Sequence, residues 1–283
     1  MLAAGGVHVK SILAVVFLVA LTSSLQAQTR RHSTSGTAND ASNSLEFPDP
    51  LATTRSHFDV DPNRTPSPGN PISVTQLRVP SKAMKSYQRA QKAFLAGDFR
   101  TSVQHLEKSI EIYPDFLQAH YLLGVSYFNL GNYEKGLSEY QRALAIDPKS
   151  NENYHNVAVA LFYLGRYPEA EKAARQALEI SPNPNQAATR CALGYILAQE
   201  RIFTPETLDL LRQSENKFPN ARLVLARIFS AQGRRDETAN ELRAYLRAPE
   251  PQNKQQVECW LAQLTNQPSA PACSSPEKQS ASH

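Results

Sequence analysis

The feature that most constrains the fold of this chain is an internal repeat of 34 residues in the middle of its 283-residue sequence. Five kinds of position return in phase over three units: a glycine, an aromatic residue two places later, two aliphatic residues and a proline. These positions are Gly97, Gly131 and Gly165; Phe99, Tyr133 and Tyr167; Ile110, Leu144 and Leu178; Ile112, Ile146 and Ile180; and Pro114, Pro148 and Pro182. A fixed period of this length is typical of an array of stacked units rather than of one closed globule.

Within one period, the apolar pattern predicts two helices joined by a tight turn. His120, Leu123, Gly124 and Tyr127 recur at the spacing of one helical face. Gly131 then suits the left-handed cap that ends a helix. A second apolar stripe follows, and the closing proline ends it because the residue before a proline is pushed out of helical geometry.

This unit resembles the tetratricopeptide repeat. Its motif places an aromatic residue, Leu-Gly and Tyr in the first helix, and Ala, Phe and a closing Pro later. The matching positions here are His120, Leu123, Gly124, Tyr127, Gly136, Tyr140 and Pro148. The resemblance implies an all-α fold, a right-handed α-solenoid of stacked helix-turn-helix repeats, with disordered N- and C-terminal flanks.

The repeats and the composition predict the following organisation. The solenoid spans 83–248, with clear units at 83–116, 117–150 and 151–184, and degenerate units at 185–218 and 219–248. The fourth unit fits only if about three residues are inserted near Arg201–Pro205. A capping helix at 249–264 covers the apolar face that a stacked array leaves at its end. The Ser/Thr/Pro-rich linker 28–80 and the tail 265–283 are expected to be disordered.

The amino terminus has the pattern of a secretory signal peptide. Lys10 precedes the apolar run Ile12–Leu21, and Ala27 is a small residue at the expected cleavage point. We therefore expect residues 1–27 to be removed and the protein to be exported, either periplasmic or secreted. Retention of this segment as an uncleaved anchor is the alternative, although a helix of ten residues spans only about half of the hydrocarbon core.

Several functional classes find no support in the sequence. Basic residues alternate with glutamate in the repeats and the net charge is only +4, so no nucleic-acid partner is expected. Seven scattered histidines and three cysteines suggest no metal site. Because no nucleophile, phosphate-binding or dinucleotide motif is present either, we expect no cofactor and no enzymatic activity.

The first helices carry a second apolar stripe beside the packing stripe, at spacing i, i+4, i+7. In the family this side lines a concave groove that receives a peptide or protein segment. The resemblance implies a lining of Tyr87, Tyr121, Val125, Phe128, Asn129, His155, Val159, Phe162 and Tyr163. Burial as core between neighbouring units is the alternative for Phe94, Phe128 and Phe162.

The resemblance thus predicts a non-enzymatic protein–protein interaction scaffold in the cell envelope or outside the cell. The family's charged clamp for acidic carboxyl-terminal peptides requires Lys, Asn and Arg on this face. The candidate places hold Tyr87, Gln91, Leu122, Glu152 and Asn156 instead. This departure favours an apolar or aromatic ligand. A structural protein that self-assembles into a homo-oligomer by end-to-end stacking is the alternative.

The cysteines allow one more expectation. Cys191 falls in a repeat helix and is expected to be an inert buried thiol. Cys259 and Cys273 could form a disulfide that pins the tail in an oxidising compartment. Free thiols at both positions are the alternative.

Overall fold

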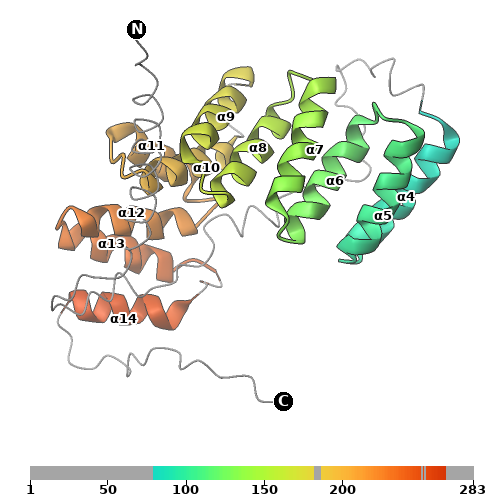
Figure 1. Ribbon diagram of the computed structural model, residues 1–283. Helices are drawn as coiled ribbons and strands as arrows, with labels where there is room; N and C mark the ends of the chain where they lie inside the picture. Colours follow the sequence, from blue (N-terminus) through green and yellow to red (C-terminus); the bar gives the residue numbers. More distant parts are fainter. Residues whose placement is uncertain (1–78, 182–185, 250, 252, 266–283) are drawn as a thin grey trace, which may run out of the picture. The chain divides into compact units, whose positions relative to one another are not determined.

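The computed structural model describes residues 79–181, 186–249, 251 and 253–265, and this described part contains eleven helices and no strand (Figure 1). The helices are α4 (Ser81–Leu95), α5 (Phe99–Ile112), α6 (Leu117–Asn129), α7 (Tyr133–Ile146), α8 (Asn151–Tyr163), α9 (Tyr167–Ile180), α10 (Ala187–Gln199), α11 (Pro205–Ser214), α12 (Asn220–Ala231), α13 (Arg235–Leu246) and α14 (Lys254–Leu264). The predicted signal peptide, nearly all of the predicted linker and Cys273 lie outside the described residues.

The helices pack as consecutive antiparallel hairpins. The closest partners are α4 with α5, α6 with α7, α8 with α9, α10 with α11, and α12 with α13. Each hairpin packs against the next through its second helix, and α14 packs against α13. The predicted all-α solenoid of stacked helix-turn-helix units is therefore confirmed.

The hairpin turns share one backbone geometry. In the second hairpin, Gly131 has a φ of +76°. Its N–H donates to the Phe128 carbonyl, and the N–H of Asn132 donates to the Tyr127 carbonyl, both at 2.9 Å. Glycine takes up this left-handed conformation without a steric cost. The equivalent glycines of the first, third and fifth hairpins are also at positive φ.

The fourth turn departs from this rule. Arg201, with a φ of +58°, occupies the place of the glycine, and the N–H of Ile202 still donates to the Leu197 carbonyl at 2.9 Å. Five residues, 200–204, separate α10 from α11, whereas three, 130–132, separate α6 from α7. The predicted insertion is present, but it comprises two residues rather than three.

Small residues let the two helices of a hairpin approach closely. A Cβ atom placed on Gly124 of α6 would lie 2.5 Å from Cε1 of Tyr140 on α7. A Cβ atom on Gly194 of α10 would lie 2.8 Å from the Leu211 side chain on α11. The glycines therefore provide the space in which a large buried side chain of the second helix packs.

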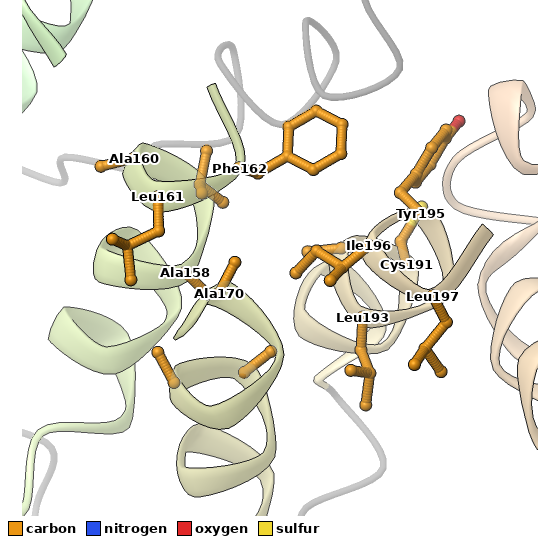
Figure 2. Packing of buried hydrophobic residues seen from close by; sticks show 14 of the residues in the cluster. Ala158, Ala160, Leu161, Phe162, Ala170, Cys191, Leu193, Tyr195, Ile196 and Leu197 are labelled. Atoms are coloured by element: carbon orange, nitrogen blue, oxygen red, sulfur yellow. The ribbon is translucent and has the colours of Figure 1, made fainter. Parts of the chain in front are cut away.

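The core follows the hairpins along the chain as three clusters of buried side chains. The largest runs from α6 to α12, a second joins α4, α5 and α6, and a third joins α12, α13 and α14 around Trp260. Figure 2 shows part of the largest cluster, in which Phe162 of α8 and Ile196 of α10 point into the space between their hairpins. The helix predicted to cover the last unit thus contributes Val257 and Trp260 to a shared core.

Candidate partner-binding surface

Three of the predicted groove residues occupy the same register on the first helices of the first three hairpins and remain partly exposed. They are Tyr87 on α4, Tyr121 on α6 and His155 on α8. The Tyr87 ring packs 4.9 Å from the Phe116 ring, and the Tyr121 ring lies 6.5 Å from the Tyr140 ring, measured between ring centroids. These contacts hold the rings in place while part of each surface stays accessible.

On α6 and α8 the next register, four residues further on, is buried instead. Val125 of α6 and Val159 of α8 expose 0% and 1% of their surface and belong to the largest core cluster. The prediction that they line an open groove is therefore wrong. Both α6 and α8 contact their own second helix, the preceding hairpin and another first helix. A helix covered on several sides needs more than one apolar stripe for packing alone.

A column of three phenylalanines, Phe94, Phe128 and Phe162, lies beside the turns of the first three hairpins. Each of its members packs against the aromatic residue that begins the second helix, five residues later. The centroid distances are 5.3 Å for Phe94–Phe99, 5.0 Å for Phe128–Tyr133 and 5.6 Å for Phe162–Tyr167. Phe128 and Phe162 expose 0% and 9% of their surface, so the core alternative holds for both and their predicted groove role is wrong.

Asn129 and Tyr163 end their helices at equivalent positions and are both partly exposed. The Asn129 Nδ2 atom donates to the Val125 carbonyl at 2.8 Å, within its own helix. The Tyr163 ring stacks on the Tyr133 ring of the preceding hairpin, at 4.9 Å and 20°, and meets the Phe128 ring edge-on at 5.1 Å. Tyr163 therefore links two hairpins, a role that the sequence did not predict.

The three partly exposed residues form an uncharged set. Burial raises the pKa of Tyr87 to about 12, partly offset by its hydrogen bond with Gln91. Burial lowers the pKa of His155 to about 4, and its buried Nδ1 atom has no hydrogen-bond partner among the described residues. At neutral pH the column therefore presents two phenols and a neutral imidazole.

A partly buried polar pair next to this region was missed by the sequence reasoning. His120, which fills the aromatic place of the repeat motif, lies 2.7 Å from Glu139 Oε2 through Nδ1 and 2.7 Å from the Pro114 carbonyl through Nε2. In the fifth hairpin Arg222 occupies the equivalent place and pairs with Glu241 at 3.1 Å. The two partners are 19 residues apart in both pairs, so the same contact is built with a histidine in one hairpin and an arginine in the other.

The described residues contain no cluster of three or more His, Cys, Asp or Glu side chains that could hold a metal ion. Cys191 is buried and free, and burial raises the pKa of its thiol to about 12 despite a hydrogen bond with Ser214. Cys259 is disulfide-bonded. Its pairing with Cys273 stays a prediction, because Cys273 is outside the described part.

A hollow of about 610 Å³ lies between α13 and the end of α14, away from the predicted groove. Its polar lining consists of two arginines, one aspartate, one amide and one hydroxyl, from Arg235, Arg243, Asp236, Asn240 and Thr265. Arg235 Nη2 donates to the Leu264 carbonyl at 3.1 Å. None of the helices that the structure describes combines the length and the apolar character required to span a membrane.

Stacked helical hairpins with glycine turns and small-residue contacts define the class of α-solenoid repeat proteins. Residues 115–182 match the family model of the tetratricopeptide repeat. The chain therefore contains tetratricopeptide repeats, as its motif suggested. No curated relative is matched by sequence comparison.

Solved structures share the fold at low sequence identity. The crystal structure of PilW, a widely conserved type IV pilus biogenesis factor, gives a TM-score of 0.58 at 20% identity, over 66% of this chain and 88% of PilW. Pseudomonas aeruginosa pilF gives 0.56 at 18% identity, over 66% and 85% of the two chains. MamA from Desulfovibrio magneticus RS-1 gives 0.55 at 13% identity, over 62% and 99%. At these identities the likeness shows the fold alone.

Proposed function

We propose that this chain is an exported, non-enzymatic scaffold that binds a segment of another protein along the first helices of its first three hairpins. The observation that carries the proposal is the column formed by Tyr87, Tyr121 and His155. These side chains keep one register on α4, α6 and α8 and remain partly exposed, whereas Val125 and Val159, four residues further on in α6 and α8, are buried.

The chemistry of this column favours a partner segment with apolar or aromatic side chains. Aromatic rings that neighbouring side chains already hold in place offer a large contact area at a low cost in conformational entropy. None of the three residues is charged at neutral pH, so an acidic peptide terminus would find no cation in the column. Tyr163 and Asn129 offer further contacts at the ends of the same helices.

Export and the absence of catalysis belong to the same proposal. The signal-peptide pattern of residues 1–27 supports a periplasmic or secreted location. The repeat architecture fills the described residues with packed helices that bury few ionisable groups. Self-assembly by end-to-end stacking is the rival proposal, and a monomeric mass by light scattering would argue against it.

The binding proposal can be tested with a random dodecapeptide library selected against the purified chain. We expect selected peptides to be rich in apolar and aromatic residues, and Tyr121→Ser to weaken their binding about tenfold or more. Tyr154→Ser is the matched control, because Tyr154 is also partly exposed on a first helix but lies outside the column. Phe128→Ser is unsuitable, since Phe128 is buried core.

Equal binding by the Tyr121→Ser variant, the Tyr154→Ser variant and the unmodified chain would contradict the proposed surface. Photo-crosslinking from a benzoylphenylalanine at position 121 provides an independent check. We expect it to label a selected peptide, whereas the same group at position 154 should not.

A further inference from the structure

The first described helix, α4, carries a stripe of cations with no acidic residue. Lys82, Lys85, Arg89 and Lys92 follow one another at intervals of three, four and three residues, and all four are exposed. Because successive residues of an α-helix turn by about 100°, the four fall within a sector of about 80° and along about 15 Å of the helix. They therefore form one straight basic stripe.

The stripe lies opposite the face that packs. Ala83 and Ala90 of α4 are fully buried, and Tyr87 lies between them in sequence on the same side. No ion pair within the described residues engages any of the four cations, in contrast to Arg175, which binds both Glu171 and Glu206. Within the described residues, the positive charge of the stripe therefore takes no part in an ion pair.

The neighbouring helix α5 carries exposed charges of both signs. On α5, which packs against α4, Arg100 and Lys108 are interleaved with Glu107 and Glu111. Like charges three or four residues apart destabilise a helix, so the uncompensated stripe does not serve the stability of α4. An external partner of opposite charge would account for it.

We propose that this stripe docks α4 onto a lipid bilayer that carries anionic headgroups. Three of the four cations are lysines, which act as mobile point charges, whereas specific carboxylate pairing favours the arginine fork. The lining of the hollow between α13 and α14 includes no residue of the stripe. Leu95, 64% exposed at the end of the same helix, supplies an apolar side chain next to Lys92 for the headgroup boundary.

This inference is independent of the aromatic column. The stripe projects from the outer side of α4, whereas Tyr87 lies on the packed side. A bilayer and a bound polypeptide can therefore be engaged together. The docking would hold the first hairpin at an anionic surface and leave the first helices of the following hairpins free.

The test measures how much of the chain sediments together with each of two kinds of lipid vesicle. The chain is purified as the expressing cell has processed it. One kind is phosphatidylcholine alone, and the other contains about 30% phosphatidylglycerol. Apolar insertion by other segments would contribute equally to the binding of both kinds of vesicle. The ratio of the two affinities therefore reports only the preference for anionic headgroups. The test variant is K82Q/K85Q/R89Q/K92Q, since glutamine is a good helix former.

The matched control is K108Q/K135Q/K149Q/K172Q, which removes the same charge from four exposed lysines elsewhere in the array. Each cation near an anionic surface contributes roughly fivefold in affinity. We therefore expect the preference for anionic over neutral vesicles to fall about 100-fold or more in the stripe variant and far less in the control. The preference of the unmodified chain should also fall as NaCl rises from about 0.05 to 0.5 M.

Three results would overturn the proposal: no preference of the unmodified chain for anionic vesicles, an equal loss in both quadruple variants, or binding of polyglutamate that needs the stripe when vesicle binding does not. The last result would identify an acidic polypeptide as the occupant. If circular dichroism shows that the quadruple stripe variant has lost helical content, the double variant K82Q/K85Q replaces it. We expect this variant to lose an intermediate part of the preference for anionic vesicles.

Discussion

The regular hairpins α6–α9 and the divergent hairpins α10–α13 build the same kind of helical hairpin with different side chains. In the regular pair, a ring near the end of the first helix packs on a ring at the start of the second, as in Phe128–Tyr133. In the fifth hairpin those two places hold Ser230 and Arg235. The Arg234 guanidinium lies 4.4 Å from the centroid of the Phe229 ring, much as Lys135 Nζ lies 5.2 Å from that of the Tyr127 ring in the second hairpin. Each turn therefore keeps one left-handed residue, which is Arg201 in the fourth hairpin and glycine in the others, although the pair of rings at the turn is not kept.

The two regions differ in a second way, in the charges that cross their hairpins. Arg222 in the fifth hairpin binds Glu215 at 2.7 Å as well as Glu241, so two carboxylates neutralise one guanidinium. In the second hairpin, His120 binds one carboxylate and one backbone carbonyl. The fifth hairpin thus uses a permanent cation where the second hairpin uses a side chain that titrates.

The largest effect is expected from filling the space beside Tyr140. The substitution Gly124→Ala places a Cβ atom 2.5 Å from the Tyr140 ring, so we expect the free energy of unfolding to fall by about 2 kcal/mol. The third hairpin has alanines, Ala158 and Ala174, where the second has Gly124 and Tyr140. In a Tyr140→Ala background, Gly124→Ala should therefore cost nothing or stabilise by up to about 1 kcal/mol.

Urea denaturation of the four proteins of this double-mutant cycle measures the coupling between the two sites. A coupling energy near zero would mean that the glycine does not provide the space for the ring. The result would also show whether the glycine–tyrosine pair of the second hairpin and the alanine pair of the third are two solutions of one packing problem.

Most of the fold was predictable because its signals recur along the chain. The glycines at 97, 131 and 165 indicated the turns, and the structure gives each a positive φ. Arg201 gave no such signal, since its left-handed backbone is set by the turn rather than by its side chain. The sequence predicted an insertion of about three residues near this turn, and the structure shows two.

The candidate site was less predictable, because an apolar stripe does not reveal what covers it. Val125 and Tyr121 are equally suited to a groove by type, yet the packing of neighbouring hairpins buries one and leaves the other partly exposed. The contact between Phe128 and Tyr133 had a signal, since both belong to columns with the same period. The pairing of His120 with Glu139 could be located only from three-dimensional positions.

A smaller effect is expected at the fourth turn, where a side chain stands in the glycine place. A residue with a Cβ atom is destabilised by about 1–2 kcal/mol in the left-handed region. Replacing it by glycine removes this cost, but the greater conformational entropy of glycine in the unfolded chain offsets part of the stabilisation. Arg201→Gly should therefore stabilise the chain by up to about 1 kcal/mol. Arg201 is exposed, so little packing is lost.

The control for this substitution is Gln199→Gly, which introduces glycine two residues earlier in helical backbone. It should destabilise by up to about 1 kcal/mol, since glycine is a poor helix former. If both glycines change the midpoint of thermal unfolding in the same direction, the backbone conformation of Arg201 is not what distinguishes the fourth turn from the others.

The smallest effect concerns the titrating cation. Burial favours the neutral ring of His120, but its hydrogen bonds with Glu139 and the Pro114 carbonyl outweigh burial and the nearby Arg142, and raise the pKa above 6.5. Both ring nitrogens face acceptors, so only the protonated ring can donate to both. Its stabilising contribution is therefore complete below the unfolded-state pKa and is lost as the pH rises through the raised pKa of the folded state.

His120→Arg, which copies the cation of the fifth hairpin, should remove this dependence. We expect the free energy of unfolding of the unmodified chain to fall relative to that of the variant as the pH is raised from about 6 to about 9. A constant difference between the two proteins over this range, or a His120 pKa below 6.5 by NMR titration, would show that the ring is neutral. In that case the second and fifth hairpins would not share an ionic contact, and the equivalence of His120 with Arg222 would be one of position only.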